Sequence, residues 1–342
     1  MKKLGIILIL LLIVSVFMSG CASNTENVST NKNGAKGASS IAELKIGYQP
    51  SIDHIAFMVA DEKGWWKTDL APYGVQDIKE YVFQTGPPEM QAMMAGDLDV
   101  AYVGAPPVII ALSQGLDAKI VGGVDINGSS LVLRPEYKYT GPQDLKELKI
   151  ATYPPGSIQD TLLRKWLKEN GLDPEKDVAI VGMTAAGDAV SAISAKKVDA
   201  VFLPHPFPTS IEKEGNGRII IQSGQMKPNH ITCVLLVGGK LIRNHPDIVE
   251  QIVKTHINAT EYAKTHKNES AHIFSDKTSG DLETINASLK EWDGAWITNP
   301  TAIENSTIDF SNVLYGLNYT QKPLTKENLF DTSFYEKAIS VK

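Results

Sequence analysis

Apolar and polar residues form short blocks of two kinds along most of the chain. Compact apolar runs, such as residues 44–48 and 99–103, predict buried strands. Blocks with apolar residues at helical spacing, such as 87–95 and 158–170, predict helices with one buried face. A loop that contains glycine or proline separates most predicted strands from the helix that follows. This order of strand, loop and helix predicts an α/β fold.

The stretch from Gly86 to Pro107, GPPEMQAMMAGDLDVAYVGAPP, shows this order most clearly. It predicts a helix from about Pro87 to Ala95, a strand that ends in Gly104, and a further helix over 107–114. In open α/β sheets, ligands bind beyond the carboxyl ends of the strands, where a helix N-terminus offers unpaired N–H groups. Gly86 and Gly104 stand at such points, although turn formation alone also explains each glycine.

The same order then recurs, which indicates two groups of strands. The first group covers 44–48, 76–83, 99–103, 119–124 and 129–133, and the second covers 148–151, 177–181, 198–203 and 218–221. A run at 231–238 is expected to return the chain to the first group, and the remainder is mostly helical. We therefore expect two α/β lobes with two crossings, near 131–135 and 225–231, and a ligand cleft between the lobes.

The N-terminus has the layout of a secretory signal. Lys2 and Lys3 precede an apolar run from Leu4 to Phe17, and small residues then lead to Cys21. This pattern predicts a lipoprotein signal peptide with Cys21 as the lipidated first residue of the mature chain. An uncleaved anchor helix is the alternative, and either would tether the protein on the outer face of the cytoplasmic membrane. We divide the chain into a signal peptide (1–20), a flexible tether (21–43), a first lobe (44–133), a second lobe (134–230) and a return to the first lobe (231–342).

Composition narrows the class of partner. The 342 residues carry a net charge of -6, and no basic run with interleaved aromatic residues occurs, so we expect no binding to nucleic acid. The second cysteine, Cys233, lies in an apolar run and is expected to be a small buried side chain.

Four motifs together resemble a known family: KIGYQP at 45–50, HIAFMVADEKGWW at 54–66, AGDLDVAYVGAPP at 95–107 and PPGS at 154–157. They resemble the lipid-anchored solute-binding proteins of ABC importers for nitrate, sulfonates, taurine and bicarbonate, with thiamine-pyrimidine-binding proteins as relatives. The resemblance implies a two-lobe periplasmic-binding-protein-like fold of type II that closes on a small solute by hinge motion. It further implies an ABC permease and its ATPase as partners, no cofactor, and a monomer.

The resemblance also implies the ligand-binding loops. The expected ligand-binding residues are Gln49, Asp53, His54, Thr85, Gly86, Gly104, Ala105, Ser129, Ser130, Gly156, Ser157, Ile158, Gln159, Asp188 and His205. Many relatives have an acidic residue where this chain has His205.

The chemistry of these residues leaves several roles open. Gly104, Ser129 and Ser157 suit an anion, because they supply N–H and hydroxyl donors. Asp53 could hold the ammonium end of a zwitterion such as taurine, or cap the helix predicted over 54–66. His205 could donate to an anionic group when protonated, stack on a ring, or be structural. The aromatic residues Tyr48, Phe83, Tyr102 and Tyr153 could line an apolar part of the cleft or pack in the core.

Other function classes lack their motifs. The cysteine-rich motif of pyrimidine-synthase relatives, the G-x-S-x-G of hydrolases and the H-E-x-x-H of metalloproteases do not occur, so we expect neither an enzyme nor a metal site. The expected function is capture of a sulfonate or taurine-like solute, with nitrate or bicarbonate next. A thiamine-pyrimidine precursor is the alternative solute. A pyrimidine-synthase-like enzyme or a sensory binding lipoprotein is the alternative role.

Overall fold

A computed structural model describes residues 41–340 of the chain. The predicted signal peptide, Cys21 and nearly all of the predicted tether lie outside these residues. Among the helices that the structure describes, none combines the length and the hydrophobicity needed to cross a bilayer.

The first sheet has six strands in the order β11-β4-β10-β3-β1-β2. These strands are β1 (Leu44–Tyr48), β2 (Ile78–Val82), β3 (Val100–Gly104), β4 (Ala118–Ile126), β10 (Ile231–Gly238) and β11 (Ala295–Trp296). Strand β1 pairs in parallel with β2 and β3, and β10 lies antiparallel between β3 and β4. Strand β10 is therefore the predicted return of the chain to its first group of strands.

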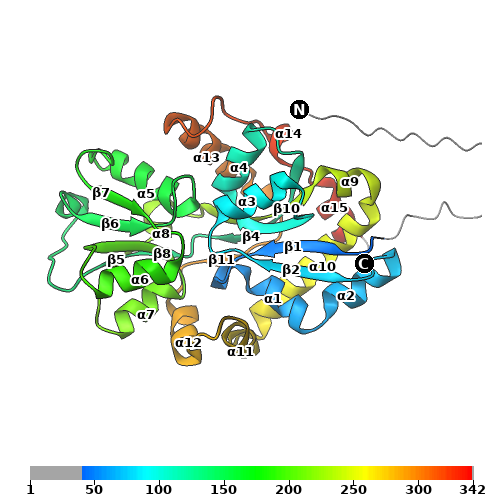
Figure 1. Ribbon diagram of the computed structural model, residues 1–342, viewed down its shortest axis with the longest axis horizontal. Coiled ribbons are helices and arrows are strands. Elements are labelled where there is room, and N and C mark those ends of the chain that lie inside the picture. The colour runs from blue at the N-terminus through cyan, green and yellow to red at the C-terminus, as the bar shows by residue number, and fades with distance from the viewer. Residues whose placement is uncertain (1–40, 341–342) are drawn as a thin grey trace, which may run out of the picture. The chain divides into compact units, whose positions relative to one another are not determined.

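The second sheet has five strands in the order β7-β6-β8-β5-β9. They are β5 (Ser129–Leu133), β6 (Lys149–Thr152), β7 (Ala179–Gly182), β8 (Ala200–Pro204) and β9 (Arg218–Gln222). Figure 1 shows this sheet beside the six-stranded sheet, with the chain passing between them. Strand β6 is parallel to β7 and β8, whereas β5 is antiparallel to β8 and β9.

The first crossing between the sheets is earlier than the sequence suggested. Residues 129–133 were expected in the first lobe, with the crossing near 131–135, but β5 pairs only with strands of the five-stranded sheet. The chain crosses instead at Asn127 and Gly128, which have φ angles of 58° and 90°. These positive φ angles end β4 and turn the chain, and glycine adopts them without steric cost.

The helices cover both sheets. They are α1 (Ile55–Glu62), α2 (Trp65–Leu70), α3 (Gly86–Ala95), α4 (Ala105–Ser113), α5 (Ile158–Glu169), α6 (Ala186–Ser194), α7 (Phe207–Lys213), α8 (Ser223–Met226), α9 (Gly239–Asn244), α10 (Pro246–Thr265), α11 (Lys267–Thr278), α12 (Leu282–Glu291), α13 (Glu304–Gly316), α14 (Lys326–Leu329) and α15 (Ser333–Ser340). The helix predicted over 54–66 is interrupted, because Gly64 has a φ of 67° and separates α1 from α2. Helix α10 packs on α1, α2 and α15, while α13 packs on α4 and α5.

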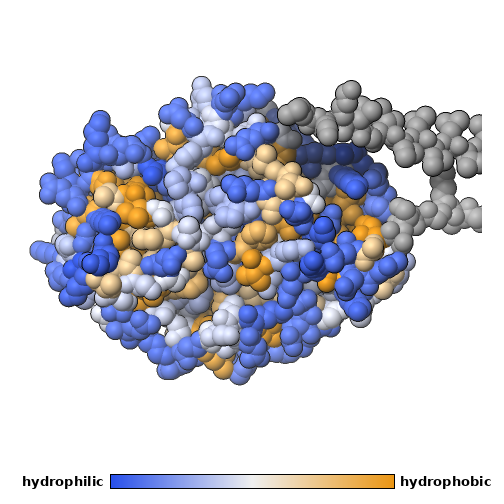
Figure 2. Space-filling view, viewed as in Figure 1, coloured by the Kyte–Doolittle hydropathy of each residue, from blue (hydrophilic) through white to orange (hydrophobic). Residues whose placement is uncertain are grey.

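The apolar core joins the two sheets. One cluster of buried side chains surrounds β1, α1 and α10. A second cluster of buried side chains includes Val108 and Ile109 of α4, Ile158 and Leu162 of α5, and Phe202 of β8. On the outside, Figure 2 shows polar residues around small apolar patches, as is usual for a protein surface.

Candidate functional site

A small cavity lies where the carboxyl ends of β1, β3, β6 and β8 meet. It is lined by Gln49, Ser51, Asp53, Gly86, Gly104, Pro107, Tyr153, Ser157, Ile158, Gln159, Pro204 and Cys233. The lining therefore comes from both sheets, as expected for a ligand cleft at strand ends. Seven of the residues predicted to bind ligand are among them: Gln49, Asp53, Gly86, Gly104, Ser157, Ile158 and Gln159.

The two sides of the cavity are in contact. The cavity volume is about 10 Å³, which is about the space that a single water molecule needs. The backbone N–H of Ile52, beyond β1, donates to the carbonyl oxygen of His205, beyond β8, at 3.1 Å. A second contact involves α5, where the Tyr319 hydroxyl donates to Oδ2 of Asp160 at 2.7 Å. A solute larger than water therefore needs the two sides to separate before it can enter.

Helix α5 supplies the hydrogen-bond donors of one wall. Ser157 caps the helix, since its Oγ accepts from the N–H of Asp160 at 3.2 Å. The next two N–H groups, of Ile158 and Gln159, donate to no atom of the described residues. Unpaired N–H groups at a helix N-terminus, together with the helix dipole, favour an anionic group.

Helices α3 and α4 also begin at the cavity but offer fewer donors. Prolines occupy their first turns, at positions 87 and 88 in α3 and at 106 and 107 in α4. Proline has no N–H, so each of these helix ends loses donors that an anion would use. Gly86 is needed there for space, because a Cβ on it would lie 2.7 Å from the Cγ atom of Pro107.

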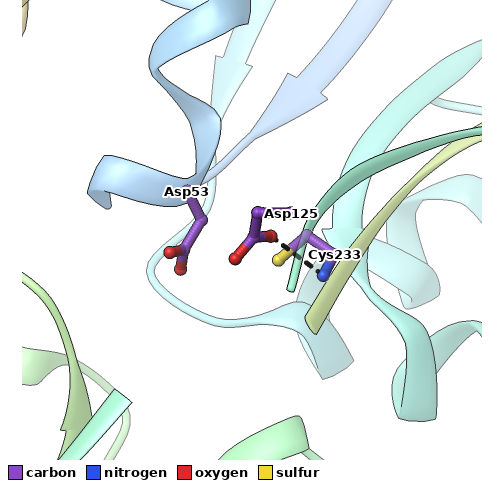
Figure 3. Close-up of side chains that lie close together, drawn as sticks. All are labelled: Asp53, Asp125 and Cys233. Atoms are coloured by element: carbon purple, nitrogen blue, oxygen red, sulfur yellow. Dashed lines mark hydrogen bonds between the residues drawn. The ribbon is translucent and has the colours of Figure 1, made fainter. Parts of the chain in front are cut away.

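A buried acidic cluster forms the opposite wall. Asp53 is 2 % exposed, and its Oδ2 accepts from the Ser51 hydroxyl at 3.1 Å. Behind it, Asp125 of β4 is fully buried, and its Oδ1 accepts from the Cys233 N–H at 3.0 Å. Figure 3 shows the Asp125 side chain between Asp53 and Cys233. The remaining oxygens, Asp53 Oδ1 and Asp125 Oδ2, accept from no other residue of the described chain, and the two carboxyl groups lie within hydrogen-bond reach of each other.

The environment raises the pKa of both acids. Burial raises the pKa of Asp53 to about 7. Burial and the neighbouring Asp53 carboxyl raise the pKa of Asp125 well above its usual range. Asp53 is therefore partly charged near neutral pH, and a cation beside it would favour the charged form.

Within the described residues, one atom each of Asp53, Asp125 and Cys233 lie within 4.8 Å of one another, which makes them the candidate metal ligands.

Asp53 is not the helix cap considered from the sequence. It lies inside the 3-10 turn Ile52–His54, where its side chain accepts no cap hydrogen bond. The first turn of α1 follows His54, whose side chain also makes no cap bond. This removes the main structural explanation for a carboxylate at this position.

Several residues that were predicted to bind ligand do not line the cavity but contact residues that do. His54 Nδ1 accepts from the N–H of Gln49 at 2.8 Å, and Ser129 Oγ accepts from Gln159 Nε2 at 3.2 Å. Glu89 in α3 accepts from Gln49 Nε2 at 2.8 Å. Burial raises the pKa of the Glu89 carboxyl well above its usual range. These contacts fix the two lining amides, Gln49 and Gln159.

His205 is buried and structural. Its Nε2 lies 2.9 Å from Ser130 Oγ and its Nδ1 lies 2.7 Å from Ser288 Oγ. Burial lowers the pKa of His205 to about 3, so the ring is neutral and does not provide a cation for an anionic solute. Thr85 and Ala105 are likewise buried without lining the cavity.

Two predicted residues lie elsewhere. Gly156 lines a separate groove with Met90, Met94 and Ile110. Asp188 is exposed, because α6 begins at Ala186 and its first turn faces outward at this position. The Asp188 carboxylate accepts from the Thr184 hydroxyl at 3.1 Å.

Of the four aromatic residues considered, Tyr153 lines the cavity. Tyr48 and Tyr102 are buried against Phe57, with ring centres 4.3 and 5.5 Å away, and Phe83 packs on the core. The sequence reading did not assign Asp125, Glu89 or Cys233 to the site. A charged residue in the apolar run IVGGVDI was the available signal for Asp125.

The comparisons with known proteins identify the family. The model described as the NMT1-like family matches residues 37–274. The chain belongs to this family. A protein of Bacillus subtilis (strain 168) named "Putative aliphatic sulfonates-binding protein" is 28% identical over 340 residues, which cover 97% of this chain and 96% of the relative. The "Nitrate/nitrite binding protein NrtA" of Nostoc sp. is 21% identical, over 77% of this chain and 67% of the relative.

A solved structure confirms the fold of this NMT1-like protein. The alkanesulfonate-binding protein SsuA from Xanthomonas axonopodis pv. citri, bound to MOPS, aligns with a TM-score of 0.75 at 18% identity. The alignment covers 86% of this chain and 99% of that protein. The expected α/β fold of the periplasmic binding proteins is therefore correct.

Proposed function

We propose that the chain is the extracytoplasmic solute-binding component of an ABC importer and captures a small zwitterion, an aminoalkanesulfonate such as taurine. The names of the sulfonate- and nitrate-binding relatives support the general role. The observation that supports the solute is the two-sided cavity, which has the free N–H groups of Ile158 and Gln159 on one wall and Asp53 on the other.

Charge favours a zwitterion over a bare anion. The lining residues include no lysine or arginine, and Asp53 pairs with neither residue type in the described part of the chain. A charged Asp53 would repel a bare anion, and the carboxyl, whose pKa burial raises to about 7, would have to take up a proton to receive it. A bare anion therefore gains no attraction from this wall. A solute with its own ammonium group turns this repulsion into attraction, so nitrate and bicarbonate rank below taurine.

Capture would occur by hinge closure of two lobes, each built on one sheet. The sheets are joined at Asn127–Gly128 and again between α8 and β10, and both links are short. Separation of the sheets would break the contact of Ile52 with His205 and expose the N-terminus of α5.

We further propose that residues 1–20 are removed and that Cys21 carries the lipid anchor, with 21–43 as the tether. The protein would then present its solute to a permease and its ATPase at the outer face of the membrane. Mass spectrometry of the N-terminal peptide from the membrane fraction tests this, and Cys21→Ser should release the protein from that fraction. A peptide that still contains residues 1–20 would contradict the processing.

The solute assignment can be tested by calorimetric titration of the full chain. Taurine is compared with ethanesulfonate, which lacks the amine, with ethylamine, which lacks the sulfonate, and with nitrate, bicarbonate and an aminopyrimidine. We expect taurine to bind at least tenfold more tightly than each of the others. Asp53→Asn should abolish the preference for taurine over ethanesulfonate, whereas Asp188→Asn, the same change on the exposed surface, should preserve it. Equal affinity for taurine and ethanesulfonate, or binding of the aminopyrimidine alone, would contradict the assignment.

A further inference from the structure

We propose that Asp53, Asp125 and Cys233 form a binding site for a thiophilic divalent cation of the zinc class, at the same wall of the cavity that faces the solute's cationic group. The metal site stands on its own geometry. Only the expected competition between metal and solute rests on the proposed function. The sequence analysis expected no metal site, because no H-E-x-x-H motif occurs. The three ligands proposed here come from segments far apart in the chain, which no local motif shows.

The backbone brings the three side chains together. Asp125 and Cys233 are paired residues of the adjacent antiparallel strands β4 and β10, where the register is irregular. Asp53 comes from the 3-10 turn after β1. One atom of each lies within 4.8 Å of the other two. The ligands of a tetrahedral zinc ion lie roughly 3.3–3.7 Å apart, given bond lengths of about 2.0–2.3 Å. Small side-chain rotations therefore suffice to bring the three atoms onto one ion.

Two oxygens of the cluster have no donor outside it. Asp53 Oδ1 and Asp125 Oδ2 are both buried and accept from no other residue of the described chain, and the two carboxyl groups lie within hydrogen-bond reach of each other. No lysine or arginine of the described residues forms an ion pair with either acid. Two carboxyl groups buried side by side need a shared proton or a cation between them. A cation between the two carboxylates would satisfy both oxygens, and it would also explain the thiol next to them.

The donor set selects the class of ion. A thiolate with two carboxylates suits Zn²⁺ and its spectroscopic substitute Co²⁺, whereas Mg²⁺ and Ca²⁺ prefer sites made of six or more oxygens. Asp53 and Cys233 both line the cavity, so the fourth position of a tetrahedral ion would face the solute. Because Asp53 can balance one neighbouring cation at a time, the metal and the ammonium group of a zwitterion should compete.

The site is tested with the full chain carrying Cys21→Ser, in which Cys233 is the only thiol. Titration with Co²⁺ should produce a thiolate-to-cobalt charge-transfer band that saturates at one equivalent. Cys233→Ser should abolish the band, and Asp125→Asn should weaken Co²⁺ binding at least tenfold. Asp188→Asn and an excess of Mg²⁺ should leave the band unchanged. Circular dichroism of each variant checks that it is folded, and Cys233→Ala serves as a second test of the thiol.

The outcomes separate this proposal from the proposed function. Absence of the band, or a band that persists in folded Cys233→Ser and Cys233→Ala, overturns the metal site even if taurine binds. A band that taurine reverses supports both the metal site and the placement of the solute's ammonium group beside Asp53. A band that saturating taurine does not affect supports the metal site and contradicts that placement.

Discussion

Single buried residues determine how this protein responds to pH. His256 is fully buried; its Nε2 lies 2.8 Å from the carbonyl oxygen of Gly123 and its Nδ1 lies 3.0 Å from the Tyr102 hydroxyl. The carbonyl can only accept, so Nε2 carries the hydrogen and Nδ1 accepts from the hydroxyl. Burial lowers the pKa of His256 to about 4. The folded ring is therefore neutral where the unfolded ring, with an ordinary pKa near 6.5, takes up a proton.

This difference predicts a pH-dependent stability. The unfolded state binds more protons between about pH 4 and pH 6.5, so the free energy of unfolding falls as the pH falls through this window. His256→Gln should make that slope less steep by up to about 1.4 kcal/mol per pH unit. Urea unfolding at several pH values measures the slope, and the same change at exposed His272 is the control. A His256→Gln slope equal to that of the unmodified chain would contradict the assignment.

Gly128, at the first crossing between the sheets, and Gly187, in α6, should respond in opposite ways to replacement by alanine. Its φ is 90°, and a Cβ would lie 2.5 Å from Trp292 Nε1 and 3.0 Å from Asp53 Oδ1. Gly128→Ala should therefore lower the free energy of unfolding by at least about 1–3 kcal/mol. Gly187 in α6 has open space around it, so Gly187→Ala should raise the free energy of unfolding by about 0.5–1 kcal/mol. Equal effects in a denaturant titration would show that Gly128 is not constrained.

At the scale of elements, α5 combines a structural and a binding role. Ser157→Ala removes the N-cap and should cost about 1 kcal/mol of stability. It should also weaken taurine binding about tenfold, because a hydrogen bond to a charged group is lost. Asp281 caps α12 by accepting from the N–H of Thr284 at 2.9 Å, so Asp281→Ala should cost similar stability without changing the affinity. Unchanged taurine affinity in Ser157→Ala would show that the Ser157 hydroxyl does not bind the sulfonate.

Elements with a strong periodic pattern were predictable, and elements that depend on distant partners were not. The strands 44–48, 129–133 and 231–238 have the predicted bounds, because each is a compact apolar run. Strand β11 has two residues and exists only through pairing with β4. Helix α7 was not predicted, because the prolines at 204, 206 and 208 are more typical of a loop than of a helix.

Residues of the candidate site also divide into those that a local pattern predicts and those that depend on distant partners. Lining residues that follow a strand, such as Gln49 and Ser157, were predictable because ligands gather at carboxyl ends of strands. The contact of Asp125 with Cys233 depends on the register between β4 and β10, which no local pattern specifies. The helix-cap role of Asp53 could be excluded only from the structure, in which its side chain makes no cap bond.

At the scale of the whole binding unit, the two sheets should open and close around the solute. The N–H of Ile52 is bonded to His205 across the cavity, so opening should expose it to hydrogen exchange. Saturating taurine should slow its exchange at least tenfold. The N–H of Lys45, bonded to Asp99 within the six-stranded sheet at 3.0 Å, should be much less affected. Equal protection of both amides would indicate general stabilisation rather than closure.

The central claim is that the cavity holds the two charged ends of a zwitterion on opposite walls. A crystal structure of the protein with taurine tests it most directly. We predict sulfonate oxygens within hydrogen-bond distance of the N–H groups of Ile158 and Gln159, and the ammonium group beside Asp53. Taurine bound in the reverse orientation, or outside this cavity, would contradict the account.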